Sequence, residues 1–223
     1  EDARAMTLAV ADQLGCPSEA VLVCSTGVIG RFLPLEKITA GIPHLVESLD
    51  DSSTAFEAAA RAMMTTDTVT KQSVREIPLT AGSCRVSGVA KGAAMIGPNM
   101  ATMLAVIMTD AVLAPAEADR ILRTAVDESF NCISVEGHTS TSDTVLLLCG
   151  GRGSLSGGDA DLEAVATAVK EVCTDLACAI VGDAEGADHQ VQIDVLGMRS
   201  REEAERIART IADDALVKTA ITG

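Results

Sequence analysis

Residues 91–108 read Lys-Gly-Ala-Ala-Met-Ile-Gly-Pro-Asn-Met-Ala-Thr-Met-Leu-Ala-Val-Ile-Met, and this stretch decides the fold. Its second part, from Thr102 to Met108, is an uninterrupted apolar run of strand length, which predicts a β-strand buried on both faces. The part before it, residues 97–101, contains Gly, Pro and Asn, which are typical of a tight turn. The stretch therefore predicts a sharp turn that leads into a central strand.

The rest of the chain predicts helices and strands around this strand. Apolar residues at helical spacing predict helices over 2–14, 34–49, 53–64, 115–128, 160–176 and 200–213. Short apolar runs predict strands at 21–24, 131–136, 143–149, 190–196 and 216–221, and residues 73–90 predict a β-hairpin. We therefore expect an α/β or α+β fold, with buried sheets covered by helices.

The composition excludes several classes of function. Lys and Arg total 17 and Asp and Glu total 32, so the net charge is -15. Such a surface repels phosphate backbones and anionic lipids, which argues against nucleic acid or membrane as a partner. The 7 cysteines are scattered, with no Cys-x-x-Cys pair, which favours reduced thiols in a cytoplasmic protein. The 3 histidines show no ligand spacing, so no metal site is expected.

Thr102 is the residue of the opening stretch that can carry chemistry. Taken alone, a threonine at the head of an apolar strand is usually an ordinary β-branched strand residue. The turn before it, however, is suited to hold the Ala101–Thr102 bond under strain, and a strained bond before a hydroxyl residue favours an N→O acyl shift. Hydrolysis of the ester would leave a hydroxyl nucleophile and an α-amine, of ordinary pKa near roughly 8, on one residue.

Several motifs of the chain resemble the ornithine acetyltransferase (glutamate N-acetyltransferase) family, and they occur in the family's order. The run 91–105 resembles the family's cleavage and nucleophile motif. The other matching stretches are 25–30, 64–68, 129–131, 140–148 and 216–221. Because these stretches extend from one end of the chain to the other, the sequence looks like an internal piece of such an enzyme, incomplete at both ends.

The resemblance implies a two-lobed self-processing fold and a reaction. The enzyme would move acetyl from N-acetylornithine to glutamate by a ping-pong route through an acetyl-threonine, a step of arginine biosynthesis. Some members also accept acetyl-CoA as donor, and no bound cofactor is expected. Residues 1–101 would be the C-terminal part of the family's α chain and 102–223 the N-terminal part of its β chain, in one intertwined catalytic unit. The cleaved chains would stay associated as a heterotetramer with two copies of each.

The resemblance also assigns roles to single residues. Cleavage between Ala101 and Thr102 would free the nucleophile, and Thr26 and Gly27 would form the oxyanion hole with a hydroxyl and a backbone N–H. The substrate-binding residues would be Thr68, Lys91, Thr102 and Glu185. An ammonium at position 91 suits a substrate carboxylate, and a carboxylate at position 185 suits the amine end of ornithine.

The chain departs from the family's pattern at five positions, some of them close to a predicted ligand. Around Glu185 the family has Asp-Gly-Glu-Gly-Ala-Thr-Lys. The differing residues are Ala184, Asp188 and His189 beside Glu185, His138 in place of a frequent Asp, and Ser142 in place of a frequent Asn. The changed charges around Glu185 leave the exact substrate open.

Two other functions are open at this point. A self-processed amidohydrolase or aminopeptidase would use the same threonine with water as the acyl acceptor, and the motif at 25–30 together with Lys91 and Glu185 argues against it. A truncated, uncleaved chain would be inactive or serve only as a binding scaffold. The intact motif at 98–102 indicates that the parent protein is active, whatever the state of this segment.

Overall fold

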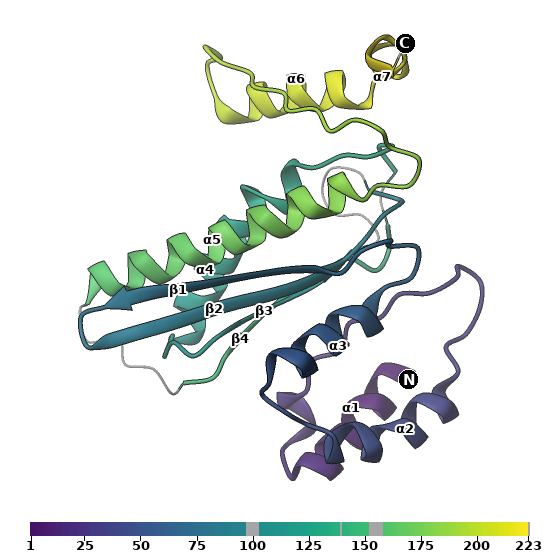
Figure 1. Ribbon diagram of the computed structural model, residues 1–223, viewed down its shortest axis with the longest axis vertical. Helices are drawn as coiled ribbons and strands as arrows, with labels where there is room; N and C mark the ends of the chain where they lie inside the picture. The colour runs from purple at the N-terminus through teal and green to yellow at the C-terminus, as the bar shows by residue number, and fades with distance from the viewer. Residues whose placement is uncertain (97–102, 139, 152–157, 223) are drawn as a thin grey trace. The chain divides into compact units, whose positions relative to one another are not determined.

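The computed structural model describes residues 1–96, 103–138, 140–151 and 158–222, and it divides into two units, Glu1–Ala59 and Ala60–Gly223. The first unit is helical. It holds α1 (Asp2–Leu14), a short 3-10 helix η1 (Ser18–Ala20), α2 (Leu35–Glu47) and the larger part of α3 (Ser53–Met63) (Figure 1). α1 packs against α2, and it ends at Gly15, whose left-handed φ of 67° lets its N–H bond Ala11 O.

The second unit is built on a four-stranded sheet in the order β1-β2-β3-β4. The strands are β1 (Lys71–Leu79), β2 (Gly82–Lys91), β3 (Leu104–Thr109) and β4 (Thr144–Cys149). β2 is antiparallel to β1 and to β3, whereas β3 and β4 are parallel and are connected through α4 (Pro115–Asp127), as a parallel pair requires. Lys91 pairs with Leu104, and Leu104 with Thr144, so β2 ends where β3 and β4 begin.

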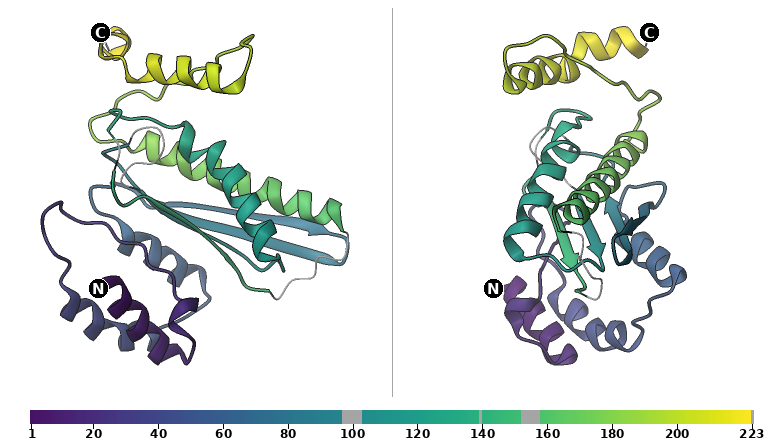
Figure 2. Two further views of the ribbon diagram at one scale, coloured as in Figure 1. Left: turned by 180° about the vertical axis from the view of Figure 1, so that it is seen from behind. Right: turned by 90° about the vertical axis from the view of Figure 1, so that its left-hand side faces the viewer.

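One face of the sheet is covered by α4 and by the long helix α5 (Asp159–Gly182), which runs beside α4 and along β1 and β2 (Figures 1 and 2). The chain also holds η2 (Phe130–Cys132), α6 (Arg201–Asp213) and α7 (Ala215–Thr222). The apolar residues that α5 buries fall three or four positions apart, which is one face of a helix: Val165, Val169, Val172, Leu176 and Ile180. They form the core together with the facing side chains of β2 and β3.

Polar bonds fix where α5 lies on the sheet. At its first turn, Asp161 Oδ1 accepts hydrogen bonds from the N–H and the hydroxyl of Thr80 in the β1–β2 turn, at 3.0 and 2.9 Å. Further along, Asp175 Oδ2 accepts from Ser73 and from Arg75, both at 2.7 Å. Because bonds at both points hold the helix, its C-terminal end is placed at the edge of the sheet where β1 begins.

The mixed α/β class predicted from the sequence is confirmed, and so is the hairpin. The predicted central strand is present as β3, and Ala105, Ile107 and Thr109 on one of its faces are buried. On the other face Val106 and Met108 are only partly buried, so the prediction of burial on both faces is wrong for these two residues. Ala101 and Thr102, at the predicted cleavage point, lie outside the described residues.

Four of the predicted strands do not form: 21–24, 131–136, 190–196 and 216–221. The last is a helix, because Asp214 Oδ1 accepts from the N–H groups of Leu216 and Val217, at 2.8 and 2.9 Å, and so caps a first helical turn. In the second, the N–H of Val135 bonds the carbonyl of Ile96 rather than a neighbouring strand. An apolar run therefore does not suffice for a strand, because its backbone groups can have partners that the pattern does not reveal.

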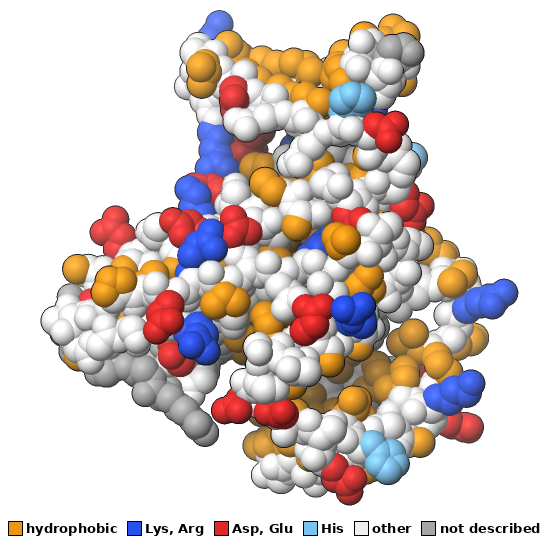
Figure 3. All heavy atoms as spheres, viewed as in Figure 1, with side chains coloured by type: hydrophobic (Ala, Val, Ile, Leu, Met, Phe, Trp, Pro, Cys, Tyr) orange, Lys and Arg blue, Asp and Glu red, His pale blue; other side chains and the backbone are white. Residues whose placement is uncertain are grey.

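On one face of the molecule the charged side chains are spread out rather than clustered by sign. On the face drawn in Figure 3, acidic and basic side chains alternate, and apolar side chains gather over α6 and α7. The exposed apolar residues of α6 and α7 include Ile207, Ile211, Leu216 and Ile221. Within the described residues, no helix combines the length and the apolar character that crossing a bilayer requires.

Gly88 allows α5 to approach the sheet closely, which gives a stability prediction. A Cβ at position 88 would lie 2.7 Å from Val172 Cγ1 and 2.9 Å from Leu176 Cδ1, so Gly88→Ala should destabilise the fold by about 1–3 kcal/mol. Chemical denaturation of the single and double variants measures this. Val172→Ala should relieve the closest of the overlaps, although those with Ile107 Cδ1 at 2.8 Å and with Leu176 remain, so the double variant Gly88→Ala/Val172→Ala should cost less than the sum of the two single changes. Additive costs would contradict the close contact.

Candidate functional site

A buried lysine organises the end of the sheet where β1, β3 and β4 begin. The Lys71 side chain is fully buried, and its ammonium lies 2.7 Å from Asp67 Oδ1 and 2.6 Å from Asp183 Oδ2. Asp67 belongs to the loop before β1, and Asp183 follows the last turn of α5. A buried charge is stable only when it is paired and hydrogen-bonded, and here one cation meets two carboxylates. The arrangement ties loop, strand and helix together.

Asp67 connects this lysine to the end of β2. Its Oδ1 also accepts from the N–H of Gly92 at 2.6 Å, and its Oδ2 accepts from the N–H of Thr65 at 3.1 Å. Burial alone would raise the pKa of Asp67, but these bonds and the Lys71 ammonium outweigh it and hold the pKa below its ordinary value. Asp67 is therefore an anion that fixes the backbone immediately after Lys91.

Asp183 holds the predicted substrate ligand Thr68. It accepts from the Thr68 N–H at 2.9 Å and from the Thr68 hydroxyl. Burial would raise the pKa of Asp183, and the bonds from Lys71 and Thr68 overcome this and lower it. Since the Thr68 hydroxyl donates to Asp183, its oxygen lone pairs remain as acceptors for another group.

Lys91 is the last residue of β2 and is 3% exposed. Its side-chain ammonium forms no hydrogen bond or ion pair with any residue that the structure describes, although its backbone pairs with Leu104. Burial lowers its pKa; Asp67 raises it in part, and Lys71 lowers it further. A buried ammonium that lacks a hydrogen-bonded anion is suited to receive one, for instance a substrate carboxylate.

Glu185 is brought to the same place through its backbone. Its N–H donates to the carbonyl of Ala93, two residues after Lys91, at 2.8 Å. The side chain is exposed, and its neighbour Ala184 is buried. The structure thus brings three predicted ligands, Thr68, Lys91 and Glu185, to one end of the sheet.

The other predicted site residues are placed differently. Thr26 and Gly27 lie in the first unit, in a segment without regular secondary structure, and the strand predicted just before them is absent. Of the two, Thr26 is partly buried and Gly27 is exposed. Thr102 and Ala101 are not among the described residues, so their predicted roles stay predictions.

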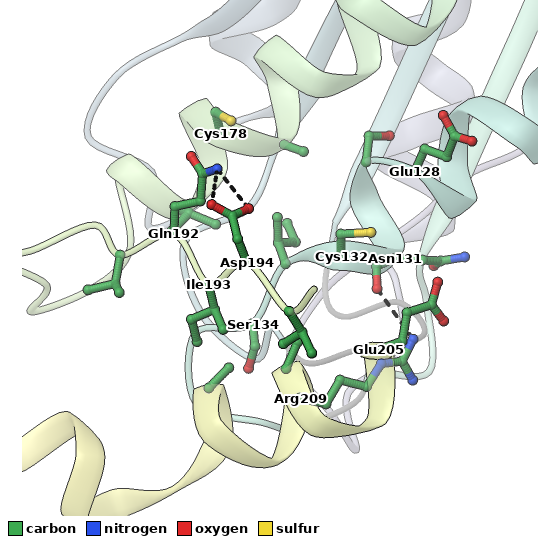
Figure 4. Close-up of a pocket in the computed structure, with 18 of the residues that line it drawn as sticks. Glu128, Asn131, Cys132, Ser134, Cys178, Gln192, Ile193, Asp194, Glu205 and Arg209 are labelled. Atoms are coloured by element: carbon green, nitrogen blue, oxygen red, sulfur yellow. Dashed lines mark hydrogen bonds between the residues drawn. The ribbon is translucent and has the colours of Figure 1, made fainter. Parts of the chain in front are cut away.

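A separate cleft of about 800 Å³ lies in the second unit, between the end of α5, η2, residues 190–195 and α6 (Figure 4). Gln192 points at Asp194 and bonds both of its carboxylate oxygens, at 3.0 and 3.1 Å, while Arg209 reaches the carbonyl of Asn131 at 3.5 Å. None of the predicted site residues that the structure describes lines this cleft. Across the described part of the chain, no three His, Cys, Asp or Glu residues are grouped to hold a metal ion.

The chain is similar to known proteins. The model of the ArgJ family matches residues 1–223. The chain belongs to the ArgJ family. It is 47% identical over 222 residues to the arginine biosynthesis bifunctional protein ArgJ of Methylococcus capsulatus, covering 98% of this chain and 54% of the relative. It is 45% identical to that of Geobacter sulfurreducens, covering 100% and 57%. The chain therefore spans about half the length of these ArgJ relatives.

Two solved structures are also similar. One is the crystal structure of the arginine biosynthesis bifunctional protein ArgJ from Bacillus halodurans, with 34% identity and a TM-score of 0.48, covering 51% of this chain and 55% of that one. The other is the L-aminopeptidase D-Ala-esterase/amidase of Ochrobactrum anthropi, with 13% identity and a TM-score of 0.38, covering 53% and 42%. The resemblance inferred from the motifs is thus confirmed at the level of the family, by the ArgJ model that matches the whole chain.

The sequence analysis did not identify three residues that hold the predicted ligands in place: Asp67, Lys71 and Asp183. Asp67 lies inside the Thr-Thr-Asp-Thr motif and Asp183 lies two residues before Glu185, so both are close to residues that the motifs single out. Lys71 begins a strand at a buried position, where an apolar residue would be expected. A lysine in a buried strand position is a signal that carboxylates are nearby.

Replacing Lys71 tests the buried cluster. Lys71→Met leaves two buried carboxylates without their cation, which should destabilise the protein by about 3–5 kcal/mol at pH 7. The lowered pKa values of Asp67 and Asp183 stabilise the wild type above the ordinary carboxyl pKa, and this contribution is lost as the pH falls through the folded values. The difference in unfolding free energy between the variant and the wild type should therefore become smaller below about pH 5.

Denaturant titrations at pH 7 and at about pH 3, below the ordinary carboxyl pKa of roughly 3.9, measure the difference in unfolding free energy between the variant and the wild type. Arg123→Met, which removes an exposed pair with Asp119, serves as control and should not move the midpoint at either pH. A difference in unfolding free energy that is the same at both pH values would show that Lys71 stabilises the fold by packing rather than by its charge.

Proposed function

We propose that this chain is part of a self-cleaving acetyltransferase that moves acetyl from N-acetylornithine to glutamate, a step of arginine biosynthesis. The ArgJ relatives are named as bifunctional proteins of that pathway, and the family match covers the whole chain. Acetyl-CoA is a second donor to be tested, and the proposal includes no resident cofactor. The observation that carries it is the buried Lys91, at the sheet end where the stretch leading to Thr102 departs.

The proposed chemistry begins with the Thr102 hydroxyl attacking the carbonyl carbon of Ala101. The C–N bond breaks, an ester forms, and water hydrolyses it to leave a carboxylate on Ala101 and a free amine on Thr102. The same hydroxyl then attacks the acetyl carbon of N-acetylornithine while the amine takes its proton, and ornithine leaves. The amino group of glutamate attacks the acetyl ester, which gives N-acetylglutamate and restores the hydroxyl.

The described residues supply binding for this route. The Lys91 ammonium pairs with a substrate carboxylate, the Thr68 oxygen accepts from a substrate N–H, and Glu185 meets the ornithine ammonium. Thr26 and Gly27 would stabilise the developing oxyanion with a hydroxyl and a backbone N–H. Two copies of each chain made by cleavage would remain together as a heterotetramer that acts on small molecules. The free thiols of all 7 cysteines suit the reducing cytoplasm.

Mass spectrometry tests the self-cleavage. The full product of the gene should yield two fragments that meet between Ala101 and Thr102, and Thr102→Ala should give one uncut chain and lose acetyl transfer by about a thousandfold or more. Thr102→Ser keeps a hydroxyl and is the control that should still cleave. An uncut wild-type product would overturn the proposal. Cleavage with release of acetate but no N-acetylglutamate would assign the chain to the amidohydrolases instead.

The pH dependence of glutamate binding tests Lys91. Because burial lowers the pKa of Lys91, its charge is lost at a lower pH than that of an ordinary lysine, and the KM for glutamate should rise on the alkaline side. Lys91→Arg keeps its charge and should move this rise to higher pH, whereas Lys91→Met should raise KM at every pH. Steady-state kinetics from pH 7 to pH 10 measures the three. Identical alkaline limbs in wild type and Lys91→Arg would contradict a binding role for this charge.

A further inference from the structure

One segment of the chain bonds the described residues on both sides of the predicted cleavage stretch. Ile96 and Met103 are the described residues on either side of residues 97–102, and both side chains are buried, at 1% and 2% exposure. Each of the two residues is held at its N–H and at its carbonyl. The partners at both places come from one segment, residues 135–144, which lies between η2 and the start of β4.

Upstream, Glu136 and Val135 hold Ile96. The N–H of Ile96 donates to Glu136 Oε1 at 2.9 Å, and its carbonyl accepts from the N–H of Val135 at 2.6 Å. Downstream, Asp143 and Thr144 hold Met103. The N–H of Met103 donates to Asp143 Oδ1 at 2.8 Å, and its carbonyl accepts from the N–H of Thr144 at 3.1 Å. We call the pair of hydrogen bonds at Ile96 and the pair at Met103 the two clasps. A carboxylate is a strong acceptor for a backbone N–H, so each clasp holds its residue firmly.

The second oxygen of Asp143 strengthens the case at the downstream side. Asp143 Oδ2 is buried and has no hydrogen-bond partner within the described chain. Burial raises the pKa of Asp143, and hydrogen bonds from the Met103 N–H and the Ser140 hydroxyl offset this only in part. An unsatisfied buried carboxylate oxygen is costly, so its presence beside the residue that follows Thr102 calls for a function.

We propose that Glu136 and Asp143 are positioning residues: Glu136 fixes the chain before the cleavage point, and Asp143 fixes the chain that carries Thr102. This rests on the proposed function and extends it to residues outside the predicted site. Cleavage separates the two clasps, because Ile96 then belongs to one chain and Met103 to the other. Before cleavage Ile96 and Met103 belong to one chain, which both carboxylates hold; after cleavage only Asp143 holds, through Met103, the chain that would begin with Thr102.

The two residues should therefore affect the two reactions differently. Glu136→Ala should slow self-cleavage by about tenfold to a hundredfold but leave acetyl transfer, once cleavage is complete, within about twofold of wild type. Asp143→Ala should slow both by about tenfold to a hundredfold. Asp143→Asn keeps an acceptor oxygen for the Met103 N–H and should recover part of both rates. A purely structural role would not separate cleavage from transfer in this way.

Asp110 provides the matched control, since its Oδ1 accepts from the Arg85 N–H at 2.9 Å at the opposite end of β2 and β3. Asp110→Ala should lower the thermal midpoint without changing either rate. The experiment follows cleavage by intact mass over time, transfer after complete cleavage, and thermal midpoint, in the full product of the gene. A Glu136→Ala variant that loses acetyl transfer as strongly as cleavage, or an Asp110→Ala variant as slow as either of the other two, overturns the inference alone. A wild type that never cleaves overturns the proposed function as well.

Discussion

The fold around the site depends on one buried ammonium, that of Lys71. Two carboxylates meet it, and each also binds a second group, since Asp67 accepts from the N–H of Gly92 after β2 and Asp183 accepts from Thr68 before β1. Desolvating three charges is costly, and apolar residues of similar size would often give a more stable core. What the ionic cluster adds is direction, because its hydrogen bonds fix where the loop, the strand end and the helix end lie. These bonds set the positions of the predicted substrate ligands Thr68 and Lys91.

How much of the fold and the site is predictable depends on the range of the interactions. The apolar run after Thr102 and the helical spacing in α5 are local patterns, and both elements form as predicted, although α5 continues six residues past the expected end. It does so because Ile180 still packs in the core and Gly182 is the first residue that breaks the pattern. The buried cluster was not predicted, since Lys71 and Asp183 are 112 residues apart and no periodicity connects them.

The predicted strands that do not form also show that local sequence patterns do not determine every element. Residues 216–221 are rich in β-branched and apolar side chains, which locally favours a strand. A single carboxylate, that of Asp214, decides otherwise by accepting two consecutive N–H groups and starting a helix. Likewise, Val135 gives its N–H to Ile96 and so cannot join a ladder. Strand propensity therefore does not decide the structure where a side chain or a distant carbonyl accepts a hydrogen bond from the backbone N–H.

The charges of the site explain why a carboxylate is the expected ligand. Lys71 is already neutralised by two hydrogen-bonded anions, whereas Lys91, almost equally buried, feels Asp67 only through space and is opposed by Lys71. The cost of burying Lys91 as a cation is therefore not fully offset in the unliganded site. A substrate carboxylate that reaches it would offset that cost and raise its pKa, so binding and protonation of Lys91 are linked. We therefore expect Lys91 to bind an anion best at a pH below its own lowered pKa, and the ion pair, once formed, to keep the lysine charged.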